Sequence, residues 1–408
     1  MMSGAVEQWR RKKRRRVVSP SPSPSPTSGL MSLPDDMVLN CLARVSRSDH
    51  RALSQVSKSS RSLVVSPDLY ETRSRMGFTE DCIYICLLAP YSRNPVGWFT
   101  IRWRGRGEEN RLTRIPMPPF PTPNRATFVP LGSRIYVIGG SISAESTSRV
   151  SFLDCRTHTW SQVPSMRVAR AAASAGVLDG KIYVMGGCWD GDPSNWAEVF
   201  DPKMQTWSNV IIPDAVNWAY APKVVGRDSY LYNFGSEGGM CNDLINTRDA
   251  SCAIDKLLYC RDPKGRIMWC DPWSGVRKGR MEWYKVNGLE DLEGFLKDDF
   301  ESQDMGKQIL SDGVNADLWD SYLLKRGYPY GLEDLVPGSQ LIKSGGNLFV
   351  FWGVLVGNHP RKRLQVWCAE ISLERRHGGQ IWGIIQCSDH VFTTGPDLTF
   401  LSSFNVNL

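Results

Sequence analysis

The stretch Ile135-Tyr-Val-Ile-Gly-Gly140 decides the fold, because it returns as Ile182-Tyr-Val-Met-Gly-Gly187 at a spacing of 47 residues. Two further residues recur at this spacing, Asp154 as Asp201 and Trp160 as Trp207. Each copy predicts a buried β-strand that ends at two glycines, where the chain turns or approaches another backbone closely. We therefore expect structural roles for Gly139, Gly140, Gly186, Gly187, Trp160 and Trp207.

A repeat of this length, with a strand, Gly-Gly, Asp and Trp, resembles the kelch repeat, in which each copy forms one four-stranded propeller blade. The clear copies cover residues 125–165 and 172–212, and eroded strands follow at Ser229–Gly235 and Gly346–Gly353. Residues 288–337 do not fit the pattern and are interpreted as an insertion. The length from residue 79 to 408 then predicts one closed propeller of about six blades, closed by pairing of the first and last strands.

The segment before the propeller, residues 31–78, predicts three or four short helices, and it resembles an F-box. The F-box is a small helical module that docks a Skp-family adaptor. One departure is Ser60, which stands where the F-box pattern usually has an aromatic residue. The resemblance implies that the adaptor is bound by Leu33, Pro34, Val38, Leu42, Leu53, Val56 and Lys58.

Residues 1–30 are predicted to be a disordered tail, with a basic run followed by four Ser-Pro pairs. The run consists of Arg10, Arg11, Lys12, Lys13, Arg14, Arg15 and Arg16, whose seven charges equal the formal net charge of +7. The rest of the chain is formally neutral, which argues against a broad nucleic-acid face. The run predicts nuclear targeting. The alternative is a solvated segment that touches nucleic acid nonspecifically.

Cysteine usage and hydropathy exclude several protein classes. The 11 cysteines are odd in number and contain no C-x-x-C pair, which argues against a disulfide framework or a zinc ribbon. No apolar stretch follows the basic start, and no apolar run is long enough for a membrane span. We expect reduced thiols and no membrane association.

Some kelch propellers are copper oxidases, so an enzyme has to be considered. That chemistry needs His and Tyr ligands converging on one axis. The five His residues show no placement related to the repeat, and no hydrolase or phosphate-binding motif occurs. We expect no catalytic residues, no metal and no cofactor.

Loops between the strands of a propeller are the usual binding surfaces, because the blades are structural. The loop after Gly187 mixes aromatic and polar side chains, and two arginines precede it. These features predict contacts to a protein target by Arg167, Arg170, Trp189, Asp190, Asn195 and Trp196. An ordinary solvent-exposed loop is the alternative.

The chain is thus predicted to be multi-domain, with a small all-α F-box followed by an all-β kelch propeller. This order resembles the plant F-box/kelch-repeat proteins. The resemblance implies a non-catalytic receptor of a Skp–cullin–F-box ubiquitin ligase. Its F-box would bind the adaptor, and through it a cullin, while the propeller holds a target protein for ubiquitination and degradation. The alternative, favoured by Ser60, is a ubiquitin-independent scaffold whose F-box has decayed.

Overall fold

The chain forms two compact units, residues 1–76 and 77–408. The predicted tail with its basic run, and most of the predicted insertion, lie outside the described residues. The computed structural model describes residues 33–88, 96–102, 111–143, 145–188, 193–210, 224–227, 230–233, 251–255, 257–262, 265–271, 282–292, 339–356, 363–394 and 399–408.

The first unit is helical, as the sequence predicts. Its elements are α1 (Asp35–Ala43), a short 3-10 turn (Arg47–Asp49), α2 (His50–Val56), α3 (Lys58–Val64) and α4 (Pro67–Met76). Apolar residues spaced three and four apart place one face of each helix inward. The resulting core contains Val38, Leu42, Ala43, Val64 and Leu69.

A buried arginine joins the last helix of this unit to the first. The guanidinium of Arg73 on α4 donates to the carbonyl oxygens of Ala43 at 3.1 Å and Val45 at 2.6 Å. These carbonyls lie at the end of α1, where helical partners are missing and a cation is favourable. Arg73 therefore caps α1 and fixes α4 against it.

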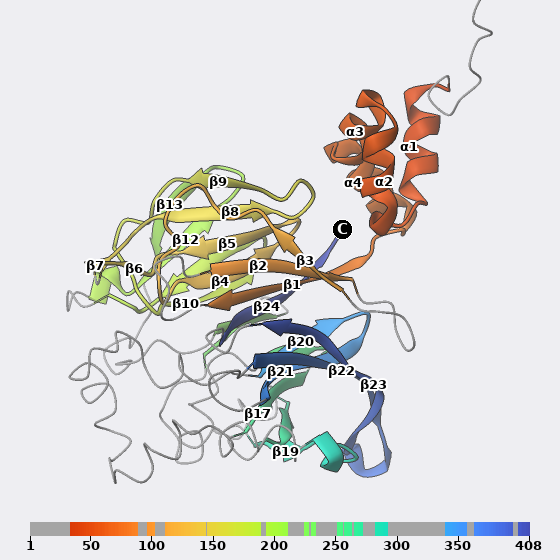
Figure 1. Ribbon diagram of the computed structural model, residues 1–408. Coiled ribbons are helices and arrows are strands. Elements are labelled where there is room, and N and C mark those ends of the chain that lie inside the picture. Colours follow the sequence, from red (N-terminus) through yellow and green to blue (C-terminus); the bar gives the residue numbers. More distant parts are fainter. Residues whose placement is uncertain are drawn as a thin grey trace, which may run out of the picture. The chain divides into compact units, whose positions relative to one another are not determined.

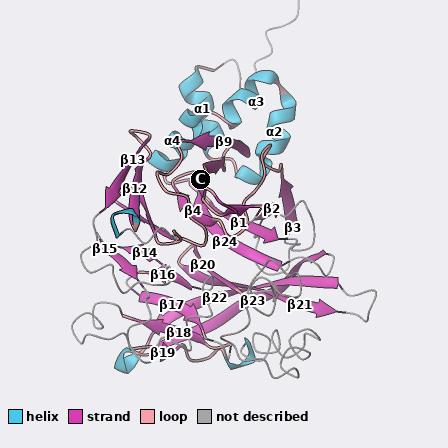
Figure 2. Cartoon of the chain, turned by 90° about the vertical axis from the view of Figure 1, so that its left-hand side faces the viewer, coloured by secondary structure: helices cyan, strands magenta, loops and turns pink. Residues whose placement is uncertain are grey.

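The second unit consists of antiparallel sheets, drawn as magenta strands in Figure 2. The two clear repeats each form one four-stranded sheet. The first contains β4 (Thr127–Leu131), β5 (Arg134–Ile138), β8 (Val150–Asp154) and β9 (Thr159–Val163). The second contains β10 (Ser174–Leu178), β11 (Lys181–Met185), β12 (Ala197–Asp201) and β13 (Thr206–Val210). A short hairpin, β6 (Ser141–Ile142) and β7 (Glu145–Ser146), follows β5.

Two further sheets follow in the chain. One contains β16 (Ser251–Ile254), β17 (Leu257–Arg261), β18 (Ile267–Cys270) and β19 (Tyr284–Lys285). The other contains β20 (Gln340–Ser344), β21 (Asn347–Val356), β22 (Arg363–Arg375) and β23 (Ile381–Thr394).

The remaining four-stranded sheet closes the propeller, as predicted. Its order is β24-β1-β2-β3, from β24 (Thr399–Asn407), β1 (Asp81–Leu88), β2 (Val96–Arg102) and β3 (Arg111–Ile115). The C-terminal strand thus pairs along the whole first strand, from Asp81 opposite Asn407 to Leu88 opposite Thr399. Figure 1 shows the dark blue β24 beside the orange β1.

The described residues form five four-stranded blades, fewer than the predicted count of about six. A two-stranded sheet, β14 (Val224–Arg227) and β15 (Tyr230–Asn233), lies between the second clear repeat and the blade that begins with β16. The first strands contact one another around a ring, in the order β24, β4, β10, β14, β16 and β20. Between β13 and β16, β14 and β15 are the only strands that the structure describes.

Neighbouring blades are joined by a hydrogen bond that recurs with the repeat. Trp160 on β9 donates from Nε1 to the carbonyl of Pro116, just after β3, at 2.9 Å. One repeat later, Trp207 on β13 donates to the carbonyl of Pro164, just after β9, at 2.8 Å. In both cases the indole of an outer strand reaches the chain that leaves the previous blade.

The paired glycines lie where backbones approach closely. A Cβ atom on Gly139 would stand 2.4 Å from the carbonyl oxygen of Arg170, and one on Gly187 would stand 2.7 Å from that of Ala171. All four repeat glycines have positive φ angles. The backbone at these glycines can therefore approach the neighbouring connection only because glycine has no side chain.

Candidate functional site

Several large apolar side chains of the helical unit face solvent. Leu33 precedes α1, Met37 lies in its first turn, Val56 ends α2 and Val65 follows α3. Val56 is 74% exposed and Met37 is 55% exposed. The core of the unit leaves these four apolar side chains uncovered.

The predicted adaptor residues divide into two groups. Val38 and Leu42 are buried in the core, so the structure corrects their assignment from binding to packing. Leu53 is partly buried against the same core. Those that remain exposed are Leu33, Pro34, Val56 and Lys58. Met37 was missed because it follows Asp36 and lies outside the apolar face that begins at Val38.

Ser60 is buried, and it takes part in the cap of α3. Its backbone N–H donates to Ser57 Oγ at 3.0 Å, and the two hydroxyl oxygens lie 2.9 Å apart. The Ser57 side chain thus caps the helix in the usual way. Helix α3 therefore forms with serine at the position where the pattern has an aromatic ring.

On the propeller, the strongest polar constellation surrounds Arg170, in the connection between the two clear repeats. Its guanidinium lies 3.1 Å from the Glu198 carboxylate, and both side chains are fully buried. The same guanidinium donates to the carbonyls of Gly186 at 2.7 Å, of Trp196 at 3.1 Å and of Asn195. Glu198 also accepts the backbone N–H groups of Arg167 at 2.7 Å and Val168 at 3.1 Å.

This constellation fixes the loop between β11 and β12 at both ends, because Arg170 binds carbonyls on either side of it. The sequence placed Arg170 among the target contacts, and the structure corrects this. Its guanidinium donates to a carboxylate and three carbonyls inside the blade, which leaves it no exposed surface for a target. Arg170 is a positioning residue for the loop. Glu198 was missed because an acidic residue on a strand reads as solvent-facing.

The other predicted target residues have different positions. Arg167 is exposed, and Asn195 and Trp196 are half-buried, with Trp196 packed against Met185 and Ala197. Trp189 and Asp190 lie outside the described residues. Of the predicted set, the exposed Arg167 and the half-buried Asn195 and Trp196 thus border the loop that Arg170 holds.

Among the residues that the structure describes, no group of three or more His, Cys, Asp or Glu could hold a metal ion. His158 lies in a turn of the first clear repeat, where Nε2 is 3.1 Å from the Tyr84 hydroxyl. No helix in the described ranges is long and apolar enough to cross a membrane.

Both units match known families. The F-box domain model matches residues 30–72, and the model described as FKB95, Kelch-repeats domain, matches residues 98–322. At5g49000, an F-box/kelch-repeat protein of Arabidopsis thaliana, is 36% identical over 98% of this chain and 99% of its own. Another from the same plant, At4g39590, is 34% identical over 94% and 92%. The solved structure of YjhT aligns with 76% of this chain and 91% of its own, at a TM-score of 0.30 and 11% identity.

A helical unit that carries an F-box and a propeller built from kelch repeats define one class of protein. This chain belongs to the F-box/kelch-repeat family. Its architecture is consistent with the role of a substrate receptor in a Skp–cullin–F-box ligase, and an F-box implies binding to a Skp-family adaptor.

Proposed function

We propose that this protein is the substrate-recognition subunit of a Skp–cullin–F-box ubiquitin ligase. Its helical unit binds the adaptor, and through it a cullin, while its propeller holds a target protein for ubiquitination and degradation. The protein performs no chemistry itself and needs no cofactor.

The observation that carries this proposal is the exposure of Leu33, Met37, Val56 and Val65 on a unit of the F-box family. Burying a large aliphatic side chain at an interface contributes about 1.5–3 kcal/mol. The core of the unit does not include these four side chains, so we expect the adaptor to cover them.

The test is capture of a purified Skp-family adaptor by the full-length chain. Met37→Glu combined with Val56→Glu should reduce capture by about a hundredfold, because each charge loses its hydration at the interface. Both side chains are exposed, so the helical unit should keep its fold. Met204→Glu is the matched control, because Met204 is a 71% exposed apolar residue on the propeller. Equal adaptor capture by the unaltered chain, the double variant and the Met204→Glu variant would contradict the proposal.

The competing function is a scaffold that works without ubiquitin. Ser60 favours the scaffold, because this serine replaces an aromatic residue of the F-box pattern. The unaltered protein decides between the two. If it captures no Skp-family adaptor at micromolar concentration, the scaffold is the better description.

We extend the proposal to the nucleus, on the basis of the run Arg10–Arg16. Replacing these seven residues by alanine should move a fluorescent fusion of the protein from the nucleus to the cytoplasm. Replacing the serines of the Ser-Pro pairs by alanine is the matched control, since it leaves the charge unchanged. An unchanged nuclear fraction in the first variant would reduce the run to a solvated segment.

We also propose that β14 and β15 belong to a sixth blade. The contacts of β14 with β10 and β16 support this assignment, since they complete the ring of first strands. A crystal structure in which β10 packs directly on β16 would contradict it.

A further inference from the structure

The hairpin of β22 and β23 is longer than its blade requires. These strands have 13 and 14 residues, whereas strands β5 and β11 of the clear repeats have 5 each. Pairing between β21 and β22 stops at Leu348 opposite Ile371, but the pairing of β22 with β23 continues to Arg375 opposite Ile381. The end of the hairpin therefore projects past its own sheet.

This projecting end is held firmly by the segment that follows β19. The N–H of Asn287 donates to the carbonyl of Ile381 at 3.0 Å, and its carbonyl accepts from the N–H of Gly383 at 2.9 Å. Val286, Leu289 and Ile381 share one buried cluster. In Figure 1 the blue ends of β22 and β23 lie beside this teal segment. Backbone hydrogen bonds and a buried cluster thus fix the position of the hairpin end.

The turn itself has a fixed conformation. The N–H of Arg376 donates to the carbonyl of Gln380 at 2.9 Å, and that of Gly379 donates to the carbonyl of Arg376 at 3.2 Å. Gly378 and Gly379 both have positive φ angles, which glycine adopts without strain.

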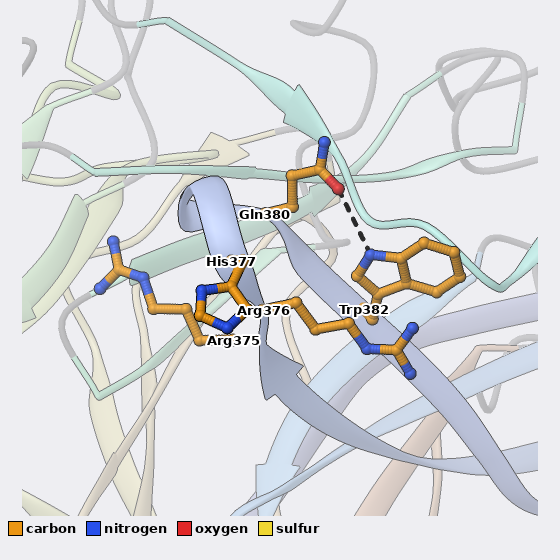
Figure 3. A pocket seen from close by; sticks show the side chains of 5 residues that line it. All are labelled: Arg375, Arg376, His377, Gln380 and Trp382. Atoms are coloured by element: carbon orange, nitrogen blue, oxygen red, sulfur yellow. Dashed lines mark hydrogen bonds between the residues drawn. The ribbon is translucent and has the colours of Figure 1, made fainter.

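The turn carries an open hollow of about 690 Å³, which is drawn in Figure 3. The Arg376 guanidinium lies 4.3 Å from the centre of the Trp382 ring, and Trp382 Nε1 donates to Gln380 Oε1 at 3.5 Å. Trp382 therefore supports one face of the guanidinium, whose edge is exposed and donates one hydrogen bond, to Glu374 at 3.4 Å. The lining residues are Arg375, Arg376, His377, Gln380 and Trp382.

The charge of this hollow is unbalanced. Among the carboxylates that the structure describes, Glu374 forms the one ion pair with this hollow, at 3.4 Å from Arg376, and it is half exposed. Arg375 makes no ion pair with any carboxylate of the described residues. Figure 3 shows Arg375 and Arg376 extending to opposite sides of His377. Two guanidinium groups held apart on a rigid turn match anionic groups that are spaced along a chain.

The geometry points to a binding site for an acidic segment of a target protein, whose carboxylate or phosphate groups are held by Arg375 and Arg376. Apolar surface continues along the same face of β23, because Ile384 lies two residues beyond Trp382 and is 39% exposed. A peptide that mixes acidic and apolar residues fits this surface. Nucleic acid does not, because the chain outside Arg10–Arg16 has no net positive charge.

This inference deepens the proposed function, since it names the chemistry of the target. It is tested without the adaptor, so that failure of adaptor capture and failure of peptide binding are separate results. The full-length chain is titrated into short fluorescent peptides of identical apolar content, with either glutamate, phosphoserine or lysine at the charged positions. Fluorescence anisotropy reports binding.

We expect the glutamate or phosphoserine peptide to bind and the lysine peptide to fail. Arg375→Ala with Arg376→Ala should weaken binding by about tenfold or more, because each charged contact is a strong one. Arg363→Ala is the matched control at the other end of β22 and should bind as the unaltered chain does. Binding of phosphoserine alone would identify phosphate as the anionic group.

Three results would overturn the inference. The peptides could bind regardless of charge, the double variant could keep its affinity with an unchanged melting temperature, or a single-stranded RNA could bind through the same arginines with higher affinity than the acidic peptides. Circular dichroism of each variant shows whether the propeller is intact.

Discussion

Arg170 and Glu198 form a fully buried ion pair that joins the connection between two blades to the first residues of β12. Every oxygen of the carboxylate has a donor, from the guanidinium or from the N–H groups of Arg167 and Val168. Such a pair is costly to break, because the remaining partner keeps its charge in a site closed to water.

Arg170→Met should therefore lower the free energy of unfolding of the propeller by about 3–5 kcal/mol. The double variant Arg170→Met with Glu198→Met should recover part of this loss, since neither charge remains. Arg167→Ala, at an exposed side chain of the same connection, should change stability by less than about 0.5 kcal/mol. Urea unfolding followed by tryptophan fluorescence measures all three. A single Arg170 variant as stable as the Arg167 variant would contradict the buried pair.

Two glycines of the second clear repeat, Gly180 and Gly187, allow a controlled comparison. Gly187 and Gly180 both have positive φ, but a Cβ on Gly187 would stand 2.7 Å from a carbonyl oxygen, whereas one on Gly180 meets nothing within 4 Å. Gly180→Ala should cost about 1 kcal/mol from backbone strain alone. Gly187→Ala should cost clearly more and lower the melting temperature further. Equal losses in the two variants would show that close approach is not what requires Gly187.

The hydrogen bonds of Trp160 and Trp207 should contribute similar free energies to the stability of the propeller. Trp207→Phe keeps most of the apolar contact and removes the hydrogen bond to Pro164, which should cost about 1 kcal/mol. Trp160→Phe should cost a similar amount, since its bond to Pro116 has the same geometry. Denaturation midpoints of both variants test the equivalence, and a cost at only one site would show that the repeats have diverged energetically.

Closure of the propeller should depend on pH through Asp81. Burial raises the pKa of this carboxyl, but hydrogen bonds from Asn407, Gly345, Asn405 and Ser344 outweigh it and lower the pKa below its ordinary value. A lowered folded pKa stabilises the protein above the ordinary pKa of Asp, and the contribution disappears as the pH falls through the folded value.

Asp81→Asn should therefore lower the melting temperature at pH 7, and the difference should shrink as the pH falls below about 4 and through the lowered folded pKa. The melting temperatures of both proteins across this range measure the effect. Asp179→Asn, at a turn of the second repeat, is a control that leaves closure unchanged. A difference between Asp81→Asn and the unaltered protein that persists unchanged in acid would exclude the charge as its cause.

The sequence predicted the architecture wherever a physical requirement recurs. Gly140 and Gly187 meet the same steric limit, and Trp160 and Trp207 make the same hydrogen bond, so their spacing identifies the blade. Between β13 and β16 the sequence predicted the blade less specifically, because that segment has kept fewer of the glycine and tryptophan residues of the repeat. The blade count therefore rested on length alone, which cannot tell a blade from an insertion.

The candidate sites were predicted less well, for a related reason. Residue type alone does not distinguish a binding arginine from a structural one, and Arg170 is buried only because Glu198 lies 28 positions later in the chain and beside it in space. Val38 and Leu42 show the same limit, since an apolar residue suits a core and an interface equally. The turn at Arg375–Trp382 was missed because its residues meet only through the geometry of the hairpin.

The pairing of β24 with β1 also bears on how the protein is made. Synthesis runs from β1 towards β24, so the other described strands of the propeller leave the ribosome before the strand that completes the sheet of β1. The propeller therefore cannot close until β24 has emerged. A product that stops short of Thr399 leaves one edge of β1 without its partner strand, while its helical unit is already complete. Under the proposed function, such a fragment would occupy the adaptor without holding a target.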